Sequence, residues 1–112
     1  MGKINSRQKG AAGEREIAKI LRSHGIEARR GQQFSGSPDS PDVVADMPGF
    51  HIEVKRVENF SLRKALEQAE RDKREEAAPL ILQRGNNQPW VAVMLLEDFI
   101  KLYGEARAHE RE

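Results

Sequence analysis

Residues 11–24 carry the first clear pattern of the chain, in which apolar side chains recur every three or four positions. Glu14, Ile17, Ala18 and Leu21 fall on one stripe of the helix that this spacing predicts. The stripe should face the rest of the fold, so Glu14 is an acidic residue at a position where a charge is awkward. A buried carboxylate is costly unless it is paired with a cation or binds a metal.

Two further helices and five strands complete the predicted architecture. Apolar runs separated by turns rich in glycine, proline and asparagine predict the strands. The helices are expected at residues 61–78, ended by Pro79, and at residues 97–103, capped by Gly104; the strands are expected at residues 26–30, 42–45, 50–55, 80–82 and 90–95, the last two as buried central strands. This order predicts an α/β fold, a mixed β-sheet flanked by helices.

Length and composition fit one compact domain. The chain has 112 residues, of which 38% are hydrophobic and 33% charged, and it has no cysteine. A disordered tail, a collagen-like repeat, a disulfide framework and a thiolate metal site are thereby excluded. We expect a single domain over residues 1–104 and a charged tail, residues 105–112, that frays. No apolar stretch is long enough to cross a bilayer and no secretory signal is evident, so we expect a cytoplasmic protein.

The net charge of +1 is unevenly distributed along the chain. Residues 1–40 carry 8 Lys and Arg against 4 Asp and Glu, whereas the remainder is slightly acidic. A basic region of this kind favours a phosphate-bearing partner, although an ordinary solvated surface accounts for the charge alone equally well.

Acidic residues converge on one predicted strand. Alternation places His51, Glu53 and Lys55 on the same face, and Asp42 opens the neighbouring strand of the same hairpin. With Glu14, three carboxylates and one lysine would form a coherent site for Mg²⁺ or Mn²⁺. A surface salt bridge explains Glu53 and Lys55 without any chemistry, but the hairpin that brings Asp42 beside them favours the metal site. His51 is expected to face solvent, although its place on the Glu53 face would also allow contact with substrate.

This layout resembles the PD-(D/E)xK nuclease superfamily, through Pro41-Asp42 and Glu53-Val54-Lys55. It is more narrowly similar to the archaeal-type Holliday junction resolvases and their phage relatives. The other matching motifs, in the order of that family, are Lys9-Gly10 with Glu14-Arg15, Ser35-Gly36-Ser37, and Gln68-Ala69-Glu70. The chain departs from the family in a compressed loop before Asp42 and in a C-terminal region that looks more phage-like.

The resemblance implies a restriction-endonuclease-like core and an Mg²⁺-dependent endodeoxyribonuclease, in which Mn²⁺ would substitute. The catalytic residues that it implies are Glu14, Asp42, Glu53, Lys55 and Gln68. Asp42, Glu53, the backbone carbonyl of Val54 and Glu14 would bind the metal. Lys55 would help to deprotonate the attacking water, and Gln68 would position Lys55 or that water.

The resemblance also implies contacts with DNA. Ser35 would hydrogen-bond a phosphate near the scissile bond, although a simple turn serine is equally consistent with its position. Lys9, Arg29 and Arg30 are the residues that we expect to contact the phosphate backbone. Ordinary solvated charge explains these three equally well.

The implied substrate is branched DNA such as a four-way junction, with no small-molecule cofactor and no membrane partner. Two opposed cuts need two sites, which predicts a homodimer. Its interface is expected in the apolar C-terminal third, at Val91, Val93, Leu95, Phe99, Ile100, Leu102 and Tyr103. Alternatively, these residues complete the core of a monomer, as Trp90 and Phe99 are expected to do.

Two other functions remain open from the sequence. The first is the same nuclease chemistry on flaps, nicked DNA or foreign duplex DNA. The second is a non-catalytic DNA-binding module. The clustered acids argue against such a module, because carboxylates repel the phosphates that it would have to bind. A bacterial, archaeal or phage-infected cell is the expected setting.

Overall fold

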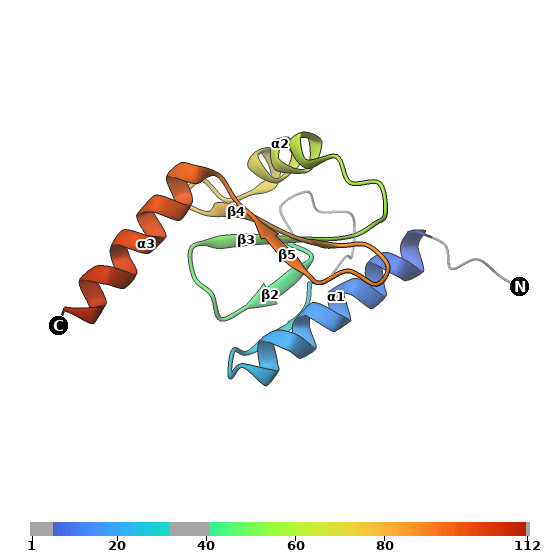
Figure 1. Ribbon diagram of the computed structural model, residues 1–112, viewed down its shortest axis with the longest axis horizontal. Helices are drawn as coiled ribbons and strands as arrows, with labels where there is room; N and C mark the ends of the chain where they lie inside the picture. Colours follow the sequence, from blue (N-terminus) through green and yellow to red (C-terminus); the bar gives the residue numbers. More distant parts are fainter. Residues whose placement is uncertain (1–5, 32–40, 112) are drawn as a thin grey trace, which may run out of the picture.

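The computed structural model describes residues 6–31 and 41–111 of the chain. These residues form three helices and a five-stranded sheet, whose arrangement is shown in Figure 1. In chain order the elements are α1 (Ser6–Ser23), β1 (Ala28–Arg30), β2 (Val43–Ala45), β3 (Phe50–Arg56), α2 (Leu62–Asp72), β4 (Ala78–Arg84), β5 (Val91–Val93) and α3 (Leu96–Glu110). The predicted order of helices and strands is confirmed.

The sheet is mixed, as predicted, and its spatial order is β1-β2-β3-β4-β5. β3 and β4 run parallel over seven residues each, whereas the other three neighbouring pairs are antiparallel. A parallel pair needs a long crossover connection, and α2 provides it. The hairpin predicted between the second and third strands forms, with Gly49 at a φ of +91° in its turn.

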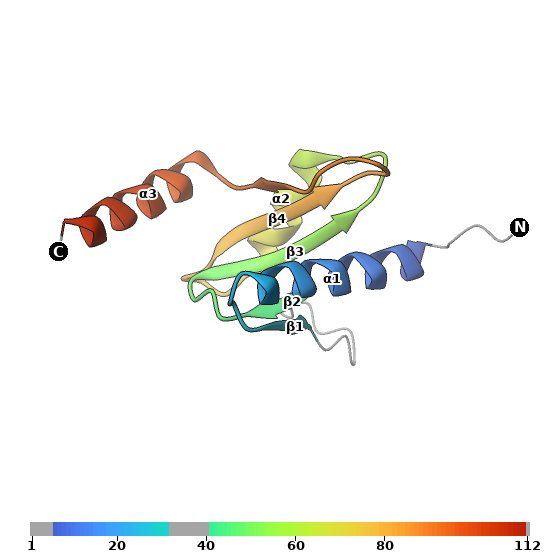
Figure 2. The same cartoon turned by 60° about the horizontal axis from the view of Figure 1, so that its bottom comes forward.

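The two faces of the sheet are covered by different helices (Figure 2). On one face, Ile17 of α1 packs in a cluster with Ile52 and Val54. On the other face, the buried side of α2 packs on Ile81 of β4. Side chains alternate along a strand, so Glu53, which is paired in register with Ile81, lies on the α2 side.

The second helix ends earlier than Pro79, which corrects the predicted stop. α2 ends at Asp72, and Lys73 is already extended. β4 must begin at Ala78 to place its full length beside β3, and Pro79 therefore lies inside the strand, where it is buried. β5 pairs only with Ile81 to Gln83, and a proline without an N–H is tolerated where a strand has a neighbour on one side only.

The C-terminal third also differs from its prediction. β5 is a short edge strand with an exposed Val91, not a buried central strand. α3 runs through Gly104 to Glu110, so the predicted cap at that glycine is wrong; the fraying of residues 105–112 stays a prediction. α3 projects from the sheet and has no buried residue (Figure 1). No helix in the described part of the chain is long and apolar enough to cross a membrane.

The connection between β1 and β2 brings two backbone segments unusually close. The Gly31 N–H donates a hydrogen bond of 2.8 Å to the carbonyl oxygen of Asp42. A Cβ atom at Gly31 would lie 2.0 Å from the carbonyl oxygen of Pro41. This position therefore requires glycine, and its backbone helps to place Asp42 at the start of β2.

Substitution of Gly31 by alanine tests this close approach. We expect Gly31→Ala to lower the free energy of unfolding by about 2 kcal/mol, because the backbone of Pro41 must move. Gly104→Ala is the matched control: a Cβ there meets nothing within 4 Å, and alanine in a helix interior should stabilise by about 0.5–1 kcal/mol. Urea denaturation measures both, and a neutral Gly31→Ala would contradict the described packing.

Candidate active site

Asp42 lies directly before β2 and is tied to β3 by both its backbone and its side chain. Its N–H donates to the carbonyl oxygen of Ile52 at 3.0 Å, and its Oδ2 accepts a hydrogen bond of 2.9 Å from the Val54 N–H. The side chain is also in hydrogen-bonding contact with the carboxyl group of Glu53. Two carboxyl groups thus meet at the start of β2, as the hairpin predicts.

Glu53 carries the most perturbed carboxyl group of the site. Its side chain is buried on the α2 face, and its Oε1 lies 2.7 Å from Nε2 of His51. The pKa of Glu53 is raised to about 7: burial raises it most, the contact with His51 lowers it, and the contact with Asp42 raises it. A site with two carboxylates in contact lacks positive charge, which a divalent cation can supply.

Glu14 is buried, as its place in the apolar stripe predicts, but it approaches from the other side of the sheet. Its Oε1 accepts a hydrogen bond of 2.9 Å from Nε of Arg30. Burial raises the pKa of Glu14, the hydrogen bond from Arg30 opposes this, and the charge of Asp42 raises the pKa again. Asp42 is therefore the carboxylate that raises the pKa of both Glu14 and Glu53.

The donor chemistry of Asp42 and Glu53 fits a hard divalent cation. Oxygen ligands are what Mg²⁺ and Mn²⁺ prefer. Burial first, and then the contact with Asp42, raise the pKa of Glu53, and a bound cation would favour the ionised form against both. In the part of the chain that the structure describes, no group of three acidic, histidine or cysteine side chains is gathered closely enough to hold a metal ion. The carboxylate of Glu14 is paired with Arg30 instead.

Two further residues of the predicted catalytic set differ in their placement. Lys55 lies two positions after Glu53 on the same side of β3 and is partly buried. Gln68 lies on α2 but is exposed, and its side chain makes no hydrogen bond with another described residue. Its predicted role beside Lys55 stays a prediction. The predicted ligand Val54 is held in place by the hydrogen bond that its N–H donates to Asp42.

The four predicted DNA contacts lie at or near the basic N-terminal region. Arg29 is exposed on β1, and Lys9 is partly exposed on α1. Arg30 is engaged with Glu14, an ion pair that the sequence did not suggest, but its side chain keeps 38% exposure. Ser35 lies outside the described residues. Contact of these residues with phosphate stays a prediction.

His51 corrects one expectation and adds a residue to the site. It was expected to face solvent, but it is 4% exposed and contacts Glu53. The alternation of side chains along β3 places both residues on one face of the sheet. They are buried because α2 covers that face, and the sequence pattern did not indicate which face α2 would cover. Trp90 packs against the α1-side core, as expected, whereas Phe99 is 50% exposed and does not fill the core.

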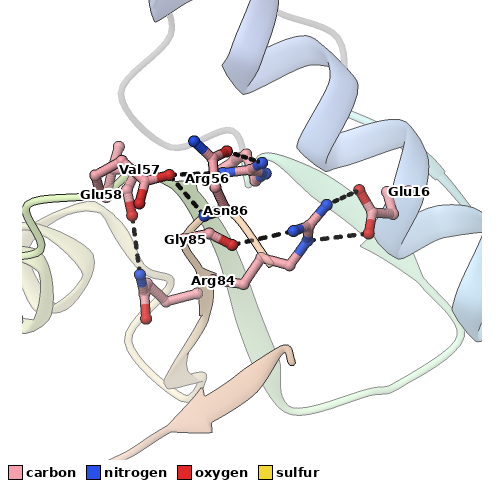
Figure 3. A network of polar contacts seen from close by, with 8 residues as sticks. Glu16, Arg56, Val57, Glu58, Arg84, Gly85 and Asn86 are labelled. Carbon is pink, nitrogen blue, oxygen red and sulfur yellow. Dashed lines mark hydrogen bonds and ion pairs between the residues drawn. The ribbon is translucent and has the colours of Figure 1, made fainter. Parts of the chain in front are cut away.

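A polar network outside the acid cluster holds α1 against the sheet (Figure 3). Glu16 accepts two hydrogen bonds from Arg84 of β4, at 3.1 and 3.2 Å, and a third of 2.9 Å from the indole of Trp90. The Arg84 guanidinium also stands 5.6 Å from the centre of the Trp90 ring. The paired cation of Arg84 lowers the pKa of Glu16. Glu16 is two residues from Glu14, so these contacts also fix where Glu14 lies.

The same network continues into the loops that follow β3 and β4 (Figure 3). Arg56 donates a hydrogen bond of 2.6 Å to Oδ1 of Asn86, and the Asn86 N–H donates one of 2.6 Å to Glu58. Arg84 donates to the carbonyl oxygen of Gly85 at 3.0 Å. The ends of β3 and β4 are therefore joined to each other and to α1.

Comparison with known proteins agrees with this architecture. The family model "Archaeal holliday junction resolvase (hjc)" matches residues 5–101. Among solved structures, the chain is similar to Hjc of Archaeoglobus fulgidus, described as a Holliday junction resolvase from an archaeal hyperthermophile, with a TM-score of 0.53, 23% identity and 72% of each chain covered. At that identity the structural likeness concerns the fold. No curated protein gives a significant match.

Proposed function

Because this chain belongs to the archaeal Holliday junction resolvase family, we propose that it cuts four-way DNA junctions with Mg²⁺ bound at Asp42 and Glu53. Membership makes the protein a structure-specific nuclease that depends on a divalent metal. The observation that carries the residue assignment is the contact of the Asp42 carboxyl group with the buried carboxyl group of Glu53. Mn²⁺ is expected to substitute for Mg²⁺, because both take oxygen ligands.

Each residue of the proposed site has its own role in the reaction. When bound, the metal neutralises charge on the scissile phosphate and lowers the pKa of water. Asp42 and Glu53 hold it, with the Val54 carbonyl and Glu14 as further ligands; Glu14 would have to turn away from Arg30. Lys55, on the Glu53 side of β3, orients and helps to deprotonate the attacking water, with Gln68 as its expected partner.

The DNA contacts follow from the positions of the basic residues. Arg29 is exposed on β1, and Arg30 ends that strand beside Glu14. Lys9 lies on α1, which also carries Glu14. We propose that these three side chains and Ser35 bind phosphates around the cut, so affinity for DNA falls steeply as salt rises. We also propose that the protein is cytoplasmic and that it is related to the phage members of the family.

Neutralising the two central acids separates cleavage from binding. We expect Asp42→Asn and Glu53→Gln each to slow junction cleavage by about 1,000-fold or more, since each removes a metal ligand. Binding of the junction should stay equal or tighten, because repulsion of the phosphates is removed. Cleavage and gel-shift assays with a labelled four-way junction measure the two effects, and Ca²⁺ should support binding without turnover.

The matched control is Asp46→Asn, an exposed acid in the turn of the same hairpin, which should cleave normally. Near-native cleavage by Asp42→Asn or Glu53→Gln would show that the metal site is assigned to the wrong residues. Linear and flap DNA, run beside the junction, distinguish resolution of junctions from the same chemistry on other substrates.

We further propose that two copies assemble through α3 and β5. The exposed fractions of Leu96, Phe99, Ile100 and Tyr103 are 68%, 50%, 54% and 56%. Phe99 and Tyr103 stack with ring centres 6.5 Å apart, so they form one continuous apolar surface. A symmetric dimer would give the two sites that paired cuts require.

Charge reversal on α3 tests this assembly. We expect a Phe99→Glu and Ile100→Glu double variant to be monomeric at micromolar concentration and to melt close to the native protein, because neither side chain is buried in one copy. Paired cutting should fall, whereas Lys101→Glu on the same helix should leave assembly unchanged. Light scattering with and without junction DNA measures the mass, and a native protein that is monomeric in both conditions would contradict the proposal.

A further inference from the structure

His51 is the second residue of β3, and its imidazole is 4% exposed on the face that α2 covers. Its Nε2 lies 2.7 Å from Oε1 of Glu53, which is 8% exposed. Both partners of this contact are thus withdrawn from bulk water. The contact lies beside Asp42, since Glu53 touches Asp42 as well.

A buried imidazole at this position is not what packing alone would select. The neighbouring buried positions of β3 are Ile52 and Val54, and the residue paired with His51 in register is the buried Pro79. An apolar side chain would fill the same place without a polar group to satisfy, and replacing a buried polar pair by apolar residues is often neutral or stabilising. The pairing of His51 with Glu53 therefore calls for a role beyond packing.

The geometry indicates what the contact does to Glu53. A carboxylate on a flexible side chain can rotate, but one of its oxygens, Oε1, is held by a ring that belongs to the same rigid strand. When Glu53 is ionised, Nε2 must carry the hydrogen of this bond. The carboxylate is then fixed toward Asp42, and a cation would meet an oriented ligand. Outer hydrogen bonds of this kind orient metal ligands and strengthen binding.

We propose that His51 is a positioning residue, which holds the carboxylate of Glu53 in the orientation that binds the divalent cation together with Asp42. This inference rests on the proposed role of Asp42 and Glu53 as cation ligands. It assigns His51 to the reaction without contact with DNA or with the reacting atoms.

Two substitutions of equal length separate positioning from packing. In His51→Gln the amide nitrogen can take the place of Nε2, whereas His51→Met fills similar space without a donor. We expect Mn²⁺ to bind DNA-free His51→Met about 10- to 100-fold more weakly than the native protein, and His51→Gln to recover most of that loss. Isothermal titration calorimetry measures the affinity, and melting temperatures confirm that both variants are folded.

Cleavage of the junction against Mg²⁺ concentration gives a second readout. His51→Met should need about 10- to 100-fold more Mg²⁺ for half-maximal cleavage, while its maximal rate at saturating Mg²⁺ stays within a few-fold of native. Native Mn²⁺ affinity in His51→Met overturns the inference. Equal losses of affinity in the Met and Gln variants, with equal falls in melting temperature, also overturn it, because they indicate a packing role.

Nitrogen NMR of the native protein tests the same contact without any substitution. We expect Nε2 of His51 to carry the hydrogen and its signal to shift when Mg²⁺ is added; an unchanged signal contradicts the inference. If the native protein binds no Mn²⁺, or if Asp42→Asn and Glu53→Gln leave binding unchanged, the proposed metal site itself fails. By contrast, a metal site that binds Mn²⁺ normally in the native protein and in His51→Met would reject only the role of His51.

Discussion

The hydrogen bond from the Val54 N–H to Oδ2 of Asp42 is the contact on which the rest of the site depends. Through this bond the side chain of Asp42 continues the hydrogen bonding between β2 and β3. Asp42, which lies outside the strand, is thereby fixed to β3. In that position Asp42 touches Glu53 and repels Glu14, and the two acids lie on opposite sides of the sheet. Gly31 makes the arrangement possible, because its backbone passes the Pro41 carbonyl at a distance that no side chain would allow. The Asp42 carboxylate thereby interacts with two acids from separate elements, Glu14 of α1 and Glu53 of β3.

Close packing and polar contacts hold α1 on the sheet, in addition to the apolar contacts of Ile17. Gly13 lets the helix approach β3 so closely that a Cβ there would lie 2.8 Å from Cβ of Arg56. Polar contacts then fix the helix on both sides, Glu14 to Arg30 of β1 and Glu16 to Arg84 of β4. In the proposed metal site this frame would have a use beyond stability. It sets the distance of Glu14 from Asp42, and hence whether Glu14 can join the other two carboxylates around a cation.

The features that the sequence predicted correctly follow from regular local patterns of side chains. The wrong predictions concern residues whose structure depends on contacts with segments that are distant in the chain. Alternation in the strand of Glu53 and the hairpin turn correctly placed Asp42 beside it. Helical spacing correctly buried Glu14, but its pairing with Arg30 depends on where β1 lies. Pro79 looked like a helix stop, because local propensity carries no information on the seven-residue register with β3. His51 was placed outside for a similar reason: α2 covers its face only through the crossover. α3 continues past Gly104, because an exposed helix tolerates a glycine at a position where a side chain would contact nothing.

We propose that Asp42 and Glu53 bind one divalent cation, and that the positive charge of Arg30 and the hydrogen bond from His51 do not take its place. A crystal structure of the protein soaked with Mn²⁺, with its anomalous scattering recorded, examines this claim most directly. The account predicts an anomalous peak between the two carboxylates, at oxygen distances of about 2.0–2.2 Å, with Nε2 of His51 still bonded to Glu53. A well-ordered structure without such a peak, or with the manganese bound only at acidic residues elsewhere, would contradict it.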